Sequence, residues 1–403
     1  MSSHAIELAL FWIYVFIGPG SWVLFGFGMI KGRKRMDLFR EPSKPLPEPP
    51  PRVSILIPAK DEAARIAGCI ESALQQNYSN FEVIAVDDRS SDGTERIMDE
   101  LAARDPHLIV LHIQPGDLPA GWFGKSFALH TAVPRAGGQW LFFVDSDVVL
   151  KPNAIGDTVA LAEEREFDLV SLLPELESGG FWESLIVPLG GVATNAMYLL
   201  PLTNANESKV AFANGQFLCI RKSVYDAVGG HAAVGHLFSE DVQIARRVKG
   251  MGYRPRLSVG TRHLSVRMYD SPQAVFHGWA RNFYAGSLGK PWRIMAAMAF
   301  LVACAFSAYA AIIFGIDRMM FPVIGSSGIG WLIAGGFHLI VMTTFIGVMY
   351  RWTGNRWTLA LLLPLGLSSM FLIFCRSLYL CATGRVAWRG TVYARGAKPQ
   401  AAG

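Results

Sequence analysis

The chain has 403 residues, of which 51% are hydrophobic and 17% charged, and its formal net charge at pH 7 is +5. This length allows more than one domain, and the modest charge gives no sign of a nucleic-acid partner. Apolar residues are concentrated before residue 31 and after residue 293. The sequence therefore predicts membrane segments at both ends of a soluble middle region.

Residues 5–30 are apolar over a length that can cross a bilayer, which requires about 20 residues. A signal peptide is the alternative. It would carry positive charge before its apolar stretch, whereas here Glu7 lies at the start and the basic cluster KGRKR (31–35) follows. We therefore expect a retained anchor with a kink at Gly18-Pro19-Gly20. The basic cluster places the next segment in the cytoplasm by the positive-inside rule.

A proline-rich spacer, EPSKPLPEPPP (41–51), leads into a region in which apolar strands alternate with helices. We expect strands at 53–59, 81–88, 108–113 and 140–147, and helices at about 61–75, 94–104 and 125–136. Continuous apolar strands that alternate with helices are typical of a parallel sheet covered on both faces. Ligands bind such sheets at the carboxyl ends of the strands.

The C-terminal part contains three apolar stretches, at about 294–316, 321–350 and 357–381, and their lengths favour membrane spans over buried soluble helices. Three crossings would place the basic tail outside the cytoplasm, against the positive-inside rule. One stretch is therefore a candidate for a re-entrant or interfacial segment, and the sequence does not show which. A further apolar segment, 184–202, is interpreted as a core helix or a membrane-surface helix.

These features divide the chain into five expected parts. They are an anchor (1–30), a basic and proline-rich linker (31–51), a soluble domain (52–290), a C-terminal membrane region (291–384) and a basic tail (385–403).

Two aspartates, Asp145 and Asp147, follow the apolar run 140–144 with one residue between them. Neighbouring carboxylates repel unless a positive charge lies between them. The pair is therefore either a solvated strand end or a site for a divalent cation on oxygen ligands. The other strand ends are also polar, with KDE (60–62) after the first and DDRSSDGT (87–94) after the second.

Together, these pieces resemble family-2 glycosyltransferases of the GT-A fold. The matching stretches occur in family order: VSILIPAKDE (53–62), VIAVDDRSSDGT (83–94), GK (124–125), VDSD (144–147), GQFLCIRKSVYDAVGGH (215–231) and SEDVQIARRVKGMGYR (239–254). The layout of apolar ends, with RMY (267–269), GWARN (278–282) and WRGTVY (388–393), is similar to membrane enzymes that glycosylate lipids. Carotenoid-acid, hopanoid-associated and ceramide glycosyltransferases are the most similar in layout.

The resemblance implies an α/β GT-A catalytic domain and a role for each matching position. Asp88 would accept a hydrogen bond from the nucleotide base, and Pro58, Ala59 and Glu62 would line the same pocket. Lys125 would lie near the diphosphate, where a compact positive charge suits phosphate oxygens.

The resemblance also implies a metal and a base. Asp147 would ligate Mg²⁺ or Mn²⁺, both of which suit oxygen ligands, and Asp145 would face the ribose or the sugar. Asp241 matches the catalytic base, which must act on the face of the anomeric carbon opposite the diphosphate. Glu240 would support this site or contact the acceptor or diphosphate. The structural alternative for this acidic pair is an exposed start of the helix that follows.

Five further residues are weaker candidates for contacts with the acceptor or the diphosphate. His231 is equally well explained as a turn residue, and Trp279 as a membrane-interface tryptophan. Arg267, Arg281 and Arg389 could bind lipid phosphates instead of the donor.

We expect an inverting glycosyltransferase that moves one sugar from a nucleotide-sugar, favoured as a UDP-sugar with GDP-mannose as the alternative, to a membrane lipid. A processive polysaccharide synthase is a competing hypothesis, although the family's Gln-x-x-Arg-Trp pattern is absent and HGWARN (277–282) stands there. A non-catalytic membrane scaffold is another, and the retained Asp145, Asp147 and Asp241 argue against it. The expected location is the bacterial inner membrane, with the catalytic domain in the cytoplasm.

Overall fold

The computed structural model describes residues 3–41, 43–237, 239–287, 290–322, 327–383, 385–388, 391–394 and 400–401. The chain divides into two compact units. The apolar-helix unit comprises Met1–Lys31, Ser178–Met197 and Tyr269–Thr383, and the sheet unit comprises Gly32–Glu177, Tyr198–Met268 and Gly384–Gly403. The soluble domain expected at 52–290 thus contributes two of its segments to the apolar-helix unit.

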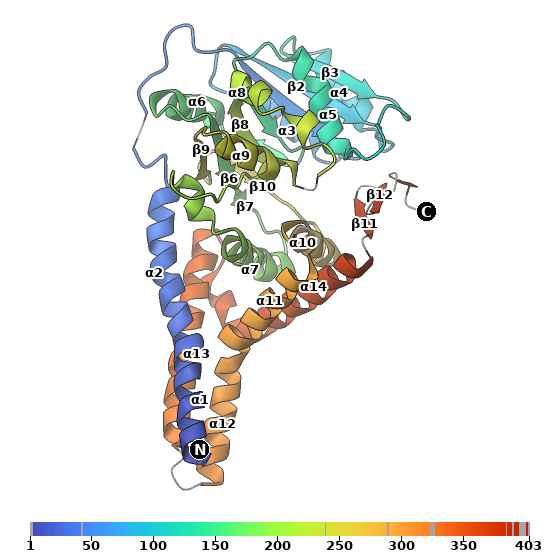
Figure 1. Cartoon of the computed structure of the whole chain (residues 1–403). Helices are drawn as coiled ribbons and strands as arrows, with labels where there is room; N and C mark the ends of the chain where they lie inside the picture. Colours follow the sequence, from blue (N-terminus) through green and yellow to red (C-terminus); the bar gives the residue numbers. More distant parts are fainter. Residues whose placement is uncertain are drawn as a thin grey trace. The chain divides into compact units, whose positions relative to one another are not determined.

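The sheet unit is built on seven strands in the order β3-β2-β1-β4-β8-β6-β9 (Figure 1). They are β1 (Val53–Ala59), β2 (Phe81–Asp88), β3 (Leu108–Ile113), β4 (Trp140–Val144), β6 (Leu169–Leu173), β8 (Phe217–Arg221) and β9 (Pro255–Val259). Every neighbouring pair is parallel except the two pairs that involve β8. The expected α/β class with a mostly parallel sheet is confirmed.

Helices cover both faces of this sheet. They are α3 (Ile66–Leu74), α4 (Thr94–Ala102), α5 (Gly124–Ala132), α6 (Ala154–Glu164), α8 (Lys222–Ala227) and α9 (Glu240–Gly250). Alternate residues of β1 enter different cores, with Ile55 and Ile57 in one and Leu56 in the other, as the period of a strand requires. Burial on both faces explains why the central strands are apolar throughout.

The helix predicted at 61–75 begins five residues later, at Ile66. Asp61 has a left-handed φ of 51°, and its carboxylate accepts a hydrogen bond from the Ser91 backbone N–H at 2.8 Å. These contacts hold the segment as a loop at the ends of β1 and β2.

Six short strands form two further sheets, separate from the main one. β5 (Val148–Leu150), β7 (Glu175–Leu176) and β10 (Leu264–Val266) form a three-stranded sheet, and β11 (Arg385–Trp388), β12 (Thr391–Ala394) and β13 (Gln400–Ala401) form another. β5 starts directly after Asp147, so the stretch predicted as one strand to residue 147 ends at Val144 and resumes at Val148.

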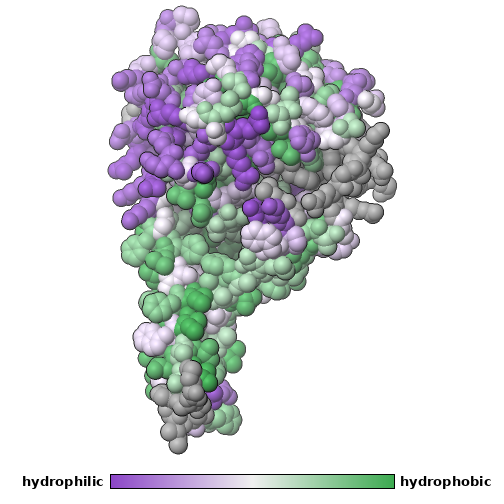
Figure 2. All heavy atoms as spheres, in the orientation of Figure 1, coloured by the Kyte–Doolittle hydropathy of each residue, from purple (hydrophilic) through white to green (hydrophobic). Residues whose placement is uncertain are grey.

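The apolar-helix unit contains α1 (Ser3–Ile17), α2 (Pro19–Met36), α7 (Phe181–Tyr198), α10 (Pro272–Gly286), α11 (Pro291–Leu301), α12 (Ser307–Met320), α13 (Gly328–Trp352) and α14 (Leu363–Thr383). Within the described ranges, four helical segments are long and apolar enough to cross a membrane: Ala5–Met36, Pro291–Met320, Gly328–Trp352 and Trp357–Thr383. One lies at the N-terminal end and three lie in the C-terminal part, as predicted. Apolar side chains cover the visible surface of these helices (Figure 2).

The apolar segment predicted at 184–202 forms most of α7 and is packed inside this unit. The Tyr350 hydroxyl of α13 donates to the Leu185 carbonyl at 2.6 Å. A side chain at Gly190 would collide with the Trp279 ring of α10. The segment is therefore a core helix, but its core is that of the apolar helices and not of the sheet.

Candidate active site

Lys125, in the first turn of α5, lies between carboxylates from distant parts of the chain. Its Nζ is 2.7 Å from Asp145 Oδ1, after β4, and 3.0 Å from Glu240 Oε1, at the start of α9. Burial alone would lower the pKa of Lys125, but Asp145, Glu240 and Asp241 together raise it well above its ordinary value. The lysine therefore stays charged. Its ion pairs hold the segment after β4 close to the N-terminus of α9.

Asp241 approaches the same lysine across a glycine. A β-carbon at Gly215 would lie 2.9 Å from both Asp241 Oδ2 and Lys125 Nζ, so only glycine leaves room for this arrangement. Burial and the charge of Glu240 raise the pKa of Asp241 to about 7, against the opposing effect of Lys125. A carboxyl group with a pKa near neutrality is suited to exchanging protons at physiological pH.

Asp147 lies in a different electrostatic environment from Asp145. Burial and the charges of Asp145 and Glu62 raise the pKa of Asp147 to about 7, although Arg65 and Lys125 act in the opposite direction. A carboxylate surrounded by other carboxylates is stabilised when a bound cation adds positive charge. Carboxylate oxygens such as those of Asp147 are the ligands that a hard divalent ion prefers.

Asp88 is buried at the end of β2 and is held by its chain neighbour. Arg89 donates to both of its oxygens, Nε to Oδ1 at 2.7 Å and Nη2 to Oδ2 at 3.0 Å. A side chain at Gly124 would collide with Asp88 Oδ2, so this carboxylate rests against the N-terminus of α5, one residue from Lys125. The structure thus brings Asp88 to the helix that also carries the lysine.

The other residues predicted for the nucleotide pocket lie at the neighbouring strand end. Pro58 and Ala59 end β1, where they pair with Val86 and Asp87 of β2. Glu62 is buried, and its backbone N–H donates to Thr94 Oγ1 at 2.8 Å.

Backbone strain is concentrated around this group. Asp61, Arg89 and Ser239 have φ values of 51°, 59° and 56°, a region that L-residues rarely adopt. Such residues are often found at functional sites, where the surrounding structure enforces them.

Of the weaker candidates, His231 lies close enough to Glu240 and Lys125 for both charges to act on its pKa. His231 is 1% exposed, its Nδ1 is 2.8 Å from the Tyr225 hydroxyl, and burial lowers its pKa to about 3. This neutral, enclosed ring matches the structural alternative. Arg267 is exposed just after β10. Trp279 and Arg281 lie on α10 of the apolar-helix unit, where Trp279 stacks on Phe283.

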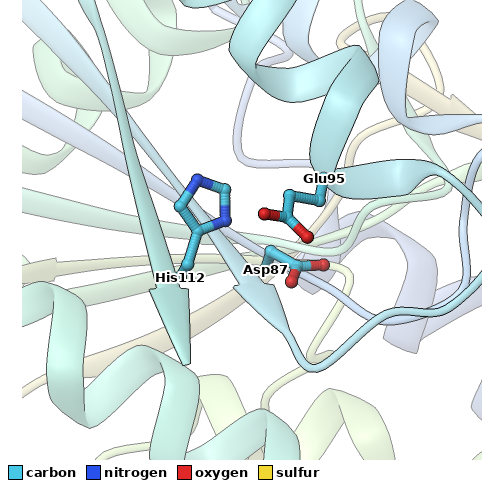
Figure 3. Close-up of side chains that lie close together, drawn as sticks. All are labelled: Asp87, Glu95 and His112. Carbon is cyan, nitrogen blue, oxygen red and sulfur yellow. The ribbon is translucent and has the colours of Figure 1, made fainter. Parts of the chain in front are cut away.

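Some predicted residues fall outside the described part of the chain, and some features were not predicted. Arg389 lies outside the described residues. The role of Gly215 was missed, although its place two residues before β8 is a usable signal. A group formed by Asp87, Glu95 and His112 was also missed. Within the described ranges, their ligand atoms all lie within 4.8 Å of one another, close enough for a metal (Figure 3).

A mostly parallel sheet with acidic strand ends and a lysine at a helix N-terminus defines an α/β domain of the GT-A type. Residues 54–229 match the model of glycosyl transferase family 2, and this part of the chain is a domain of that family.

The chain also resembles individual proteins of this class. It is 26% identical over 250 residues to 4,4'-diaponeurosporenoate glycosyltransferase of Staphylococcus aureus (strain USA300), a match that covers 61% of this chain and 64% of that protein. It also resembles the solved structure of a mannosyltransferase from Pyrobaculum calidifontis in complex with GDP-Man and Mn²⁺. There the TM-score is 0.52 at 18% identity, over 85% of this chain and 99% of the other. This second likeness concerns the fold.

Proposed function

We propose that the protein is an inverting glycosyltransferase that moves a single sugar from a nucleotide-sugar, a UDP-sugar, to a lipid acceptor in the membrane. The observation that carries this proposal is the meeting of Lys125, Asp145, Glu240 and Asp241, which come from separate motifs of a family-2 domain. The four apolar helical segments and the similarity to a glycosyltransferase of 4,4'-diaponeurosporenoate support a long, apolar acceptor.

The donor would lie along the carboxyl ends of β1, β2 and β4. Asp88 would bind the base edge, in a pocket lined by Pro58, Ala59 and Glu62. The diphosphate would lie near Lys125 and the N-terminus of α5, where the helix dipole favours negative charge. Because Lys125 Nζ already contacts two carboxylates, its charge is held in place before the donor binds.

Asp147 would hold a divalent cation, Mg²⁺ or Mn²⁺, with Asp145 facing the ribose or the sugar. When bound, this ion supplies positive charge that offsets the charge developing on the leaving diphosphate.

Asp241 would act as the general base. In its ionised form it accepts the proton of the acceptor hydroxyl while the hydroxyl oxygen forms a bond to the anomeric carbon. The bond from that carbon to the diphosphate oxygen breaks, and its electron pair leaves with the nucleoside diphosphate. Attack from the opposite face inverts the anomeric configuration. Glu240 keeps the pKa of Asp241 high enough for the carboxylate to be an effective base.

Contacts and charges at the two ends of the apolar helices support a membrane arrangement. Glu7 Oε2 of α1 lies 3.9 Å from Arg318 Nε near the end of α12, and Trp331 Nε1 of α13 donates to Glu7 Oε1 at 3.4 Å. Basic residues instead stand where α2 and α13 end, among them Arg35 and Arg351. The positive-inside rule favours the cytoplasm for these latter ends.

We further propose that α11 and α14 lie at the membrane interface, while α1–α2, the continuous helical segment 302–320 and α13 cross. A π-helical turn, Val302–Phe306, separates α11 from α12, and such turns bend helices. Figure 1 shows α11 and α14 running obliquely to α12 and α13. Arg376 lies within α14, where a span would rarely place a charge. Two C-terminal crossings return the basic tail to the cytoplasm, which removes the conflict in the sequence.

Product analysis tests the function. The full-length chain is incubated with UDP-sugars, Mn²⁺ and a membrane lipid extract, and the lipids are measured by mass spectrometry. A lipid heavier by a single sugar is the expected product. A ladder of long chains would instead support a processive synthase, and absence of both products and of donor binding would support a scaffold.

Labelling from each side of the membrane tests the topology. In a chain whose native cysteines are replaced, a membrane-impermeant maleimide should reach Asp317→Cys from outside and Lys398→Cys only after permeabilisation. External labelling at position 398 would show three C-terminal crossings and contradict the proposal.

A further inference from the structure

The group formed by Asp87, Glu95 and His112 brings together three elements at one edge of the sheet. Asp87 is at the end of β2, Glu95 in the first turn of α4 and His112 in β3 (Figure 3). Each offers one ligand atom, and these atoms lie within 4.8 Å of one another. Asp87 is buried, His112 is partly buried and Glu95 is exposed, so the group can be reached from solvent.

Two atoms of this group are buried without a partner. Asp87 is 3% exposed, and among the described residues its Oδ1 has no hydrogen-bond partner. The same holds, within those residues, for His112 Nδ1. Buried polar atoms are rarely left unpaired, and Figure 3 shows the carboxylates of Asp87 and Glu95 beside the imidazole ring. A cation bound between them would give both Asp87 Oδ1 and His112 Nδ1 a partner.

Asp99 prepares the imidazole for such a partner. Its Oδ1 is 3.1 Å from His112 Nε2, and it lies on the same face of α4 as Glu95, four residues earlier. When Nε2 carries the proton and donates to Asp99, Nδ1 keeps its lone pair for a ligand. A carboxylate that orients a metal-binding histidine in this way is a recurring feature of metal sites.

We propose that Asp87, Glu95 and His112 bind a divalent transition-metal ion such as Mn²⁺, Co²⁺ or Zn²⁺, with Asp99 as the positioning residue. An imidazole ligand favours these ions over Mg²⁺ and Ca²⁺. Ligand atoms lie about 2.1 Å from such an ion, and atoms within 4.8 Å of one another reach that distance with small side-chain movements at most. Exposed Glu95, at the first turn of a helix, is the side chain free to move.

This site is separate from the one proposed at Asp147. β1 lies between β2 and β4 in the sheet, and neighbouring strands are about 4.8 Å apart. Asp88 rests against α5, whereas Asp87, its chain neighbour, faces Glu95 of α4. The ion would therefore fasten α4 to the β2–β3 edge, two strands away from the strand that precedes Asp147.

The experiment uses the full-length Asp147→Asn chain in detergent, so that the proposed donor-site ion does not contribute. The metal-stripped chain is loaded with Mn²⁺ in the absence of nucleotide, and pulsed EPR measures coupling to an imidazole nitrogen. We expect coupling that is lost in His112→Ala. In Asp99→Asn the affinity for Mn²⁺ should fall about 10–100-fold.

One control variant and one further ligand variant make the result specific. His107→Ala removes another histidine of the same region, which pairs with Asp105, and should leave the coupling unchanged. Glu95→Gln changes an exposed residue, which separates loss of a ligand from loss of the fold, and should weaken Mn²⁺ binding. Absence of nitrogen coupling in Asp147→Asn, or coupling that persists in His112→Ala, would overturn the proposal whether or not the chain transfers sugar.

Discussion

Two aspartates lie at the end of β2 and two directly follow β4. In the part of the chain that the structure describes, one aspartate of each pair forms an ion pair with a side chain. At β2, Arg89 holds Asp88 with two hydrogen bonds. At β4, Lys125 pairs with Asp145 at 2.7 Å. In both places the paired aspartate is fixed by the protein itself.

Among the described residues, the second aspartate of each pair forms no such ion pair. Asp87 Oδ1 has no hydrogen-bond partner among the described residues, and the pKa of Asp147 is raised by burial and by neighbouring carboxylates. The difference teaches that the number of acidic residues at a strand end does not mark a cation site by itself. We expect a cation at the carboxylate that lacks an ion pair within the protein.

The largest expected effect is at the carboxylate assigned as the base. Asp241→Asn cannot accept a proton, so kcat for sugar transfer should fall by about 10²–10⁴-fold. The Kd of the donor, measured by calorimetry, should change little. Asp226→Asn is the matched control, because Asp226 is an acidic residue of the sheet unit that pairs with Lys222. A kcat for Asp241→Asn close to that of the control would remove Asp241 from the mechanism.

Loss of the positive charge of Lys125, near the end of β4, should have the next largest effect, on donor binding. A hydrogen bond to a charged group contributes about 1.5–3 kcal/mol, so Lys125→Met should weaken donor binding by roughly 10–100-fold. Lys222→Met, at an exposed pair, should not. Equal donor affinity in the two variants would show that Lys125 only holds carboxylates together.

The pH profile tests how Glu240 acts on its neighbour. Its negative charge raises the pKa of Asp241, which is about 7. In Glu240→Gln this pKa should fall, so the acidic limb of kcat/KM should move to lower pH. The limb lies on the acidic side because the base must lose its proton to act. Asp145→Asn should move the limb less, since Asp145 is the smaller influence on Asp241. A limb that stays in place would show that the two groups are not coupled.

A smaller effect is expected on stability, where the response to substitution of Asp147 should differ from that of Asp145. The pKa of Asp147 is raised in the folded chain from 3.8 to about 7. The fold therefore loses stability as the pH rises from the lower value to the higher one, and the loss is complete above about pH 7. Without metal, Asp147→Asn should therefore raise the melting temperature more at about pH 8 than at about pH 6. Asp145→Asn should lower it, because it breaks the pair with Lys125. The same response in both variants would contradict the comparison.

Much of the fold could be predicted from local sequence. The strands expected at 53–59, 81–88 and 108–113 have the observed bounds, because apolar runs between turn residues mark buried parallel strands. The late start of α3 was missed, since it depends on Asp61 and its contact with Ser91 across the sheet end. No local pattern contains that contact.

The candidate site was predicted less completely. Motifs indicated Asp145, Lys125 and Asp241 one by one, but the shared ion pairs of Lys125 depend on how α9 packs beside the end of β4. His112 gave little signal, because a single polar residue in LIVLHI reads as part of a partly buried strand. Only the fold brings His112 beside Asp87.

The anomeric configuration of the product tests the central claim most directly. NMR spectroscopy of the purified glycolipid measures the configuration at the newly bonded carbon, which is compared with that of the sugar in the donor. If Asp241 removes the acceptor proton on the face opposite the diphosphate, the two configurations will be opposite. A product with the configuration of the donor would contradict the account, because retention needs a second displacement that a single base does not provide.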